Sequence, residues 1–110
     1  MRRYLAIDIG ASSGRHIVGW VPEAGAAGAT QTEAGAKPAE AGALPAFETR
    51  EVYRFENGVR RVDGHLIWDI GHLAEEVARG IDLALAEYDD IVSLSVDTWG
   101  IDYVLLRGDV

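Results

Sequence analysis

Two short stretches of this sequence place acidic, hydroxyl and glycine residues between apolar runs, where a binding site is expected. The first, LAIDIGASSGRHIVGW (residues 5–20), has one acid, Asp8, then a run of small residues and Arg15. Small residues keep a turn slim and leave backbone N–H groups free to point at an anion. Asp8 would reach a phosphate through Mg²⁺, directly or through a bound water, and Arg15 offers a planar fork of donors. The pattern suits the terminal phosphate of a nucleotide.

The same turn also has a plainer interpretation, an ordinary hairpin turn capped by its Asp and Ser side chains. Gly10 and Gly14 allow a positive φ and a close approach of the backbone. The spacing is not that of the Walker A motif, however, and a Gly/Ser-rich turn is weak evidence by itself. From the residues alone, the phosphate-binding turn and the hairpin turn both remain open.

The second stretch is SVDTWGIDY (residues 95–103), in which Asp97 and Asp102 flank a Thr-Trp-Gly step. Trp99 could form an apolar wall against a sugar, Gly100 could offer its backbone to a hydroxyl, and the acids could accept hydroxyl donors. The alternative is a strand kink with Trp99 in the core and both acids solvated.

Other kinds of site are not expected. The histidines, His16, His65 and His72, are scattered, and the chain has no cysteine, so a zinc site has no ligand set. No G-x-S-x-G elbow is present, so the serines of the first turn are not expected to be nucleophiles. Trp68 lies in the apolar run HLIWD and is predicted to pack in the core.

The elements that must position these residues follow from hydrophobic periodicity. We predict strands at 4–9, 15–21, 47–55, 91–97 and 101–106, a short strand pair around Asp63-Gly64, and a helix at 71–88. The gap between the first two strands favours a hairpin. Opening strands followed by a crossover helix predict a mixed α/β sheet.

The predicted helix has apolar residues spaced by three and four, which is typical of one buried face. They are Leu73, Val77, Ile81, Ala84, Leu85 and Tyr88. Asp69 is placed to cap the helix, and Glu75 and Glu76 lie near its start, where acids suit the helix dipole. Gly80 lowers the helix propensity by up to ~1 kcal/mol without breaking the helix.

Composition limits the classes of partner. The net charge of -8 disfavours non-specific nucleic-acid binding, and no apolar run is long enough to span a membrane. We therefore expect neither nucleic acid nor membrane as a partner, and the cytoplasm as the compartment. Residues 22–46 are rich in Ala, Gly and Pro and are predicted to form a flexible surface insertion.

Four segments together resemble the N-terminal part of the FGGY carbohydrate kinases, a branch of the actin-like ATPases. They are LAIDIGASSGR, YRFENG, HLIWDI and SVDTWGIDYVLL, in order over residues 4–20 and 47–106. Ala11, where many relatives have threonine, and the Thr98-Trp99-Gly100 step favour the rhamnulokinase branch.

This resemblance implies a ribonuclease-H-like mixed sheet, an incomplete N-terminal kinase domain over residues 1–110, and the cofactors ATP and Mg²⁺. It implies phosphoryl transfer to L-rhamnulose, giving L-rhamnulose 1-phosphate. The implied ATP phosphate-binding turn comprises Ala11, Ser12, Ser13, Gly14 and Arg15. The resemblance also implies that Asp8 organises Mg²⁺ through a bound water. The implied sugar contacts are Gly100, with Thr98, Trp99 and Asp102 as neighbours.

The chain departs from the family in length. The general base of these kinases is an aspartate expected beyond Val110, so no residue here is assigned as catalytic, and the 110-residue chain is expected to be inactive alone. Three alternatives stay open: a kinase of this family with another ketose or polyol, a non-catalytic nucleotide-binding half-domain, and a small α/β domain with an ordinary turn. The oligomeric state is not predicted.

Overall fold

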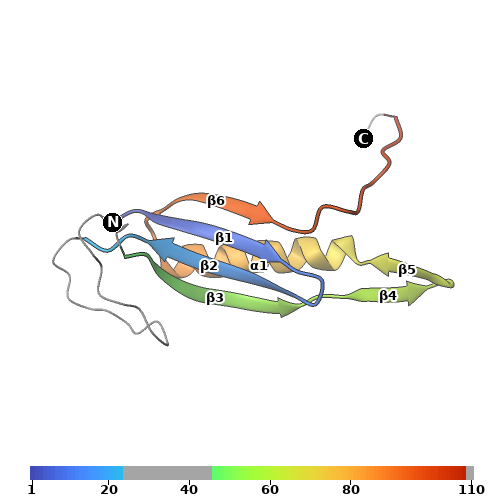
Figure 1. Cartoon of the computed structure of the whole chain (residues 1–110), viewed down its shortest axis with the longest axis horizontal. Helices are drawn as coiled ribbons and strands as arrows, with labels where there is room; N and C mark the ends of the chain where they lie inside the picture. Colours follow the sequence, from blue (N-terminus) through green and yellow to red (C-terminus); the bar gives the residue numbers. More distant parts are fainter. Residues whose placement is uncertain (24–45, 109–110) are drawn as a thin grey trace.

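The structure is a computed structural model that describes residues 1–23 and 46–108. Its elements are β1 (Arg3–Ile9), β2 (Ser13–Trp20), β3 (Glu48–Glu56), β4 (Val59–Val62), β5 (His65–Trp68), α1 (Ile70–Glu87) and β6 (Ile91–Asp97) (Figure 1). The predicted insertion at 22–46 lies almost entirely outside the described residues. Within these residues, no helix is both long and apolar enough to cross a membrane.

Four strands form a mixed sheet in the order β3-β2-β1-β6. The pairs β1–β2 and β2–β3 are antiparallel, and β1–β6 is parallel. A parallel neighbour requires a crossover, which α1 provides. The strands β4 and β5 form a separate two-stranded hairpin. The predicted mixed α/β sheet and the opening hairpin are confirmed.

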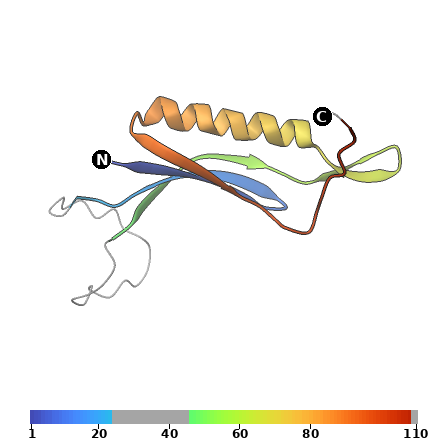
Figure 2. The ribbon, with the colours of Figure 1, turned by 90° about the horizontal axis from the view of Figure 1, so that it is seen from above.

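The core lies between the sheet and α1, which runs along one face of the sheet (Figure 2). Alternate residues of β1, Leu5 and Ile7, point into this layer with Val18 of β2 and Ala84 of α1. The alternation follows from the two-residue period of a strand. One face of the helix therefore covers one face of the sheet.

A buried histidine joins β2 to the middle of α1. The side chain of His16 is 0% exposed, and its Nε2 lies 3.0 Å from the backbone oxygen of Val77. Because a carbonyl only accepts, Nε2 carries the proton and donates. A Cβ on Gly80 would lie 2.2 Å from the His16 ring, so the helix glycine leaves room for the imidazole. Gly80 therefore has a packing role that outweighs its low helix propensity.

The start of α1 confirms one prediction and corrects another. The Asp69 side chain accepts a hydrogen bond of 3.0 Å from the backbone N–H of His72, as expected of a cap. The helix begins at Ile70, however, and its first turn has no acid. Glu75 and Glu76 lie too far along the helix to benefit from the dipole, whose effect is confined to the first turn.

The buried face of α1 is narrower than the periodicity predicts. Leu85 is 54% exposed, much like Leu83, which lies off the predicted stripe. The fully buried helix residues are Gly80 and Ala84, four apart. Leu85 follows Ala84 by one residue and is therefore turned about 100° away from the sheet.

The strand predicted at 101–106 is wrong. These residues extend away from the sheet without regular structure (Figure 1), and the apolar side chains are largely exposed. They are Ile101, Tyr103, Val104, Leu105 and Leu106. A strand needs a neighbour to take its backbone hydrogen bonds, and no described strand runs beside this segment. Apolar composition alone does not supply that neighbour.

Candidate functional site

The turn between β1 and β2 is tighter than predicted. The backbone N–H of Gly10 donates to the carbonyl of Ser13 at 2.9 Å, and β2 already begins at Ser13. Gly14 and Arg15 are paired with Ile9 and Asp8 in the ladder. Of the five residues expected in a phosphate-binding turn, Ala11 and Ser12 therefore form the exposed tip, and the other three belong to the strand.

Asn57, just after β3, holds this turn from the side. Its backbone N–H donates to the carbonyl of Ser12 at 3.0 Å, and its side-chain amide donates to the carbonyl of Gly10 at 2.9 Å. Sequence reasoning treated ENG (residues 56–58) only as a turn. The available signal was an asparagine, a residue that readily bonds backbone groups, directly after a strand.

The glycines of the turn do not serve the predicted purpose of a positive φ. Neither Gly10 nor Gly14 has one. The close approach is real, but the approaching group belongs to the protein: a Cβ on Gly14 would lie 2.1 Å from the ring of Phe55. Gly14 is thus required by packing between β2 and β3.

Asp8 and Arg15 face one another across the β1–β2 ladder. Arg15 Nη2 lies 2.5 Å from Asp8 Oδ2, and the side chains of Arg15 and Asp8 are 40% and 45% exposed. An ion pair with this exposure contributes only ~0–1 kcal/mol, so an incoming anion can compete for the guanidinium. Asp97 stands beside Asp8 in the parallel β1–β6 register. Arg54 of β3 is paired with Arg15 in turn, so charged residues lie at one level on all four strands of this sheet.

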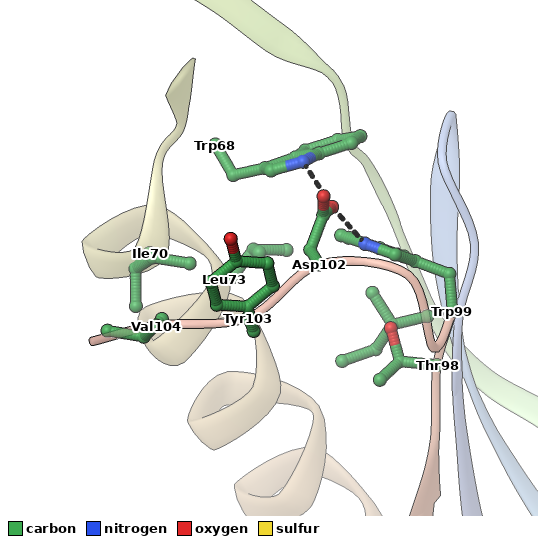
Figure 3. Close-up of a pocket in the computed structure, with 9 residues that line it drawn as sticks. Trp68, Ile70, Leu73, Thr98, Trp99, Asp102, Tyr103 and Val104 are labelled. Atoms are coloured by element: carbon green, nitrogen blue, oxygen red, sulfur yellow. Dashed lines mark hydrogen bonds between the residues drawn. The ribbon is translucent and has the colours of Figure 1, made fainter. Parts of the chain in front are cut away.

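The second candidate stretch forms a side-chain cluster around Asp102, which we call the indole cluster: Trp68, Trp99 and Asp102. The indole N–H groups of Trp68 and Trp99 both donate to Asp102 Oδ2, at 2.9 and 2.5 Å (Figure 3). The two ring centroids are 4.5 Å apart and the planes are tilted by 36°. The prediction that Trp68 packs in the core is wrong, because its indole instead binds a carboxylate near the surface.

The indole cluster borders a cavity of about 470 Å³. The lining residues are Ile9, Trp68, Ile70, Leu73, Thr98, Trp99, Asp102, Tyr103 and Val104. The structure thus places Thr98, Trp99 and Asp102 in one lining, while Gly100 does not belong to it. Ile9 immediately precedes Gly10, so the cavity adjoins the first turn.

Both candidate stretches follow the carboxyl ends of parallel neighbours, β1 and β6, in register at Asp8 and Asp97. In α/β sheets this is the edge where ligands usually bind. Over residues 1–23 and 46–108, no cluster of three or more His, Cys, Asp or Glu side chains could cage a metal ion. A magnesium ion that arrives with a nucleotide needs only one or two protein carboxylates, which Asp8 and its neighbour Asp97 can offer.

No protein-family model matches the chain. Curated relatives do: rhamnulokinase of Bacillus subtilis (strain 168) is 34% identical over 108 residues, covering 96% of this chain and 18% of that protein. Rhamnulokinase of Lactiplantibacillus plantarum is 36% identical over 106 residues, covering 96% and 17%. That of Bacteroides thetaiotaomicron is 32% identical over 108 residues, covering 98% and 18%. The chain thus spans about a fifth or less of the curated relatives it matches.

Proposed function

We propose that this chain, which is similar to rhamnulokinases over 96% of its length, forms the phosphate and sugar side of an ATP-dependent sugar kinase. The proposed reaction transfers the terminal phosphoryl group of ATP to L-rhamnulose and gives L-rhamnulose 1-phosphate. The observation that supports it most is the placement of the β1–β2 turn next to the indole-lined cavity, at one edge of the sheet. A phosphate and a sugar held there would be neighbours.

In this proposal the turn residues Ala11 to Arg15 receive the phosphates of ATP. The guanidinium of Arg15 moves from Asp8 to a phosphate oxygen, where a charge-assisted hydrogen bond is strong. Asp8 is then available for the magnesium ion that accompanies ATP and neutralises phosphate charge. Kinases of this chemistry depend mainly on such positioning and charge neutralisation.

The sugar would occupy the cavity beside the turn, with Thr98, Trp99 and Asp102 in its lining. Gly100 follows Trp99 in the chain and is the proposed backbone contact to the sugar. We further propose a ribonuclease-H-like fold, of which residues 1–110 form an incomplete N-terminal kinase domain. The catalytic aspartate lies beyond Val110, and the 110-residue chain is inactive alone. A missing general base typically costs roughly 10²–10⁴ in rate. ATP and the sugar are the proposed partners, and the cytoplasm is the proposed compartment.

The test is an activity assay of the full-length natural protein with ATP·Mg²⁺ and a panel of ketoses and polyols. Phosphorylation of each sugar is measured by the release of ADP. We expect L-rhamnulose to be the best substrate and Asp8→Asn to lower the rate by about 10²–10³, the range for loss of one key charge-stabilising group. The matched control is Asp63→Asn, the same change at the tip of the β4–β5 hairpin, which should leave the rate unchanged.

If the protein phosphorylates none of these sugars, the proposed kinase function is overturned. Preference for another ketose or polyol would keep the kinase and replace the substrate. An unchanged rate in Asp8→Asn would remove the β1–β2 turn from the active site.

A further inference from the structure

The β4–β5 hairpin projects beyond the main sheet (Figure 1), and β4 and β5 pair only with each other among the described strands. Its last residue, Trp68, nevertheless meets a segment 34 residues further along the chain, at Asp102. The hairpin therefore contributes one wall of the cavity.

The contact is built around a single carboxylate oxygen. Asp102 Oδ2 accepts from both indoles, one from β5 and one from the segment after β6 (Figure 3). Each indole has only one N–H, so both donors are used. Hydrogen bonds to an ionised acceptor are stronger than neutral ones, which makes the carboxylate an effective link between the two rings.

The walls of the cavity are mainly apolar. Beside the two indoles they include Ile9, Ile70 and Leu73. Such walls complement the C–H face of a sugar rather than its hydroxyls, as aromatic and aliphatic lining does in small-molecule sites. Because Asp102 Oδ2 is already shared by two indoles, this oxygen is placed to support the wall.

We propose that Asp102 is a positioning residue: it holds Trp68 and Trp99 together as one aromatic wall, and this wall takes the C–H face of the ketose. The inference rests on the proposed sugar-kinase function. It gives Asp102 a role besides the sequence-based expectation that the acid accepts a sugar hydroxyl, and it adds Trp68 to the site.

The first test is spectroscopic and needs no substrate. Two indoles with centroids 4.5 Å apart and planes tilted by 36° should couple electronically and give an exciton couplet in far-ultraviolet circular dichroism. In the full-length protein the couplet should disappear from Trp68→Phe and from Trp99→Phe. Trp20→Phe is the control, because Trp20 packs against Tyr88 instead, and the couplet should remain.

The second test separates a positioning role from direct binding. Asp102→Leu removes the acceptor, and we expect the couplet to fall and the KM for the ketose to rise about tenfold, the order expected from losing hydrogen bonds to a charged group. The kcat and the KM for ATP should stay within about twofold. Asp102→Asn keeps an acceptor oxygen but loses the charge, so the couplet should remain and the KM for the ketose should rise less than in Asp102→Leu.

If Asp102 instead bound the sugar directly, the couplet would survive in Asp102→Leu while the KM rose, and Trp68→Phe would leave the KM unchanged; that result would overturn the proposal. Should Asp102→Leu not fold, Trp68→Phe alone decides, through its couplet and its ketose KM. If the protein phosphorylates no sugar but shows the expected couplets, the proposed kinase function is refuted and the link between the two indoles through Asp102 is supported. A kinase without a wild-type couplet would refute only the link.

Discussion

The two halves of the candidate site lie at one edge of the sheet but are held in place by different kinds of contact. The β1–β2 turn is fixed by backbone pairing, by the two bonds of Asn57, and by the packing of Gly14 against Phe55. The indole cluster is fixed by side chains that converge on Asp102, in a segment without strand pairing. The turn is thus set mainly by backbone pairing, and the indole cluster by individual side chains.

This difference bears on how each half can change. Backbone contacts survive most substitutions, whereas a wall made from two indoles and one carboxylate is altered by any single replacement among them. In the proposed kinase, substitutions near the β1–β2 turn would therefore change ATP binding little. Substitutions in the indole cluster would change which sugar is bound.

The largest expected effect comes from breaking the turn at its tightest contact. In Gly14→Ala the new methyl group would lie 2.1 Å from the Phe55 ring, which is itself buried. We expect the free energy of unfolding, measured by urea denaturation, to fall by about 1–3 kcal/mol, the range for overpacked cores. The tryptophan couplet should be unchanged.

The control for this substitution is Gly58→Ala, where a Cβ meets nothing within 4 Å; its stability should match wild type. Combining Gly14→Ala with Phe55→Leu should cost less than the two single losses added together, since residues in contact are coupled. Full stability of Gly14→Ala would show that the turn is more plastic than the structure indicates.

A smaller effect is expected from Asn57→Ala. It removes the 2.9 Å bond to the Gly10 carbonyl while leaving the backbone bond to Ser12, a loss of about 1 kcal/mol. The KM for ATP should rise several-fold with the ketose KM unchanged, the reverse of the pattern expected for Asp102→Leu. Arg61→Ala, which removes an exposed bond to the Gly64 carbonyl, is the matched control. A raised ketose KM in Asn57→Ala would mean that the two halves are not independent.

The smallest effect is a pH dependence at His16, next to Arg15 on β2. Burial lowers the pKa of His16 from its ordinary value of 6.5, partly opposed by Val77 and Glu76. A second proton would go to Nδ1, which is buried and has no hydrogen-bond partner within residues 1–23 and 46–108. Below pH 6.5 the unfolded chain therefore binds more protons than the folded one. Stability should be complete above that pH and decline as the pH falls towards the folded pKa.

The measurement is the free energy of unfolding between pH 8 and pH 5, in wild type and in His16→Gln. The decline should be absent from the variant, whose side chain does not titrate. Asp90 does not interfere, because Arg3 lowers the pKa of Asp90 from 3.8 and its effect belongs to more acid conditions. An identical slope in both proteins would assign the pH dependence to other groups.

Local pattern predicted most of the elements. The hairpins, the helix with its Asp69 cap, and β6 all follow from residues close together in the chain. The segment 101–106 has the same apolar character as β6 but lacks a neighbour to pair with, and pairing is a property of the whole sheet. Leu85 was misplaced because the width of the buried helix face depends on what lies opposite it.

The site was predicted in outline and not in its contacts. Asp8 and Arg15 were recognised as charged groups of one turn, but their pairing depends on the strand register. Asn57 and Trp68 act on residues 47 and 34 positions away in the sequence, so periodicity gave no indication of their roles. The positive φ that the turn glycines allow is not used, because Gly14 lies in the β1–β2 ladder, and its real role, making room for Phe55 from another strand, also depends on register.

The contact between His16 and Gly80 has an evolutionary consequence. A methyl group at position 80 has no space while the imidazole is present, and a small residue at position 16 leaves a void that the glycine does not fill. Each substitution is harmful alone, and the two together compensate. The positions are therefore epistatic, and among related sequences a larger residue at 80 should be accompanied by a smaller one at 16.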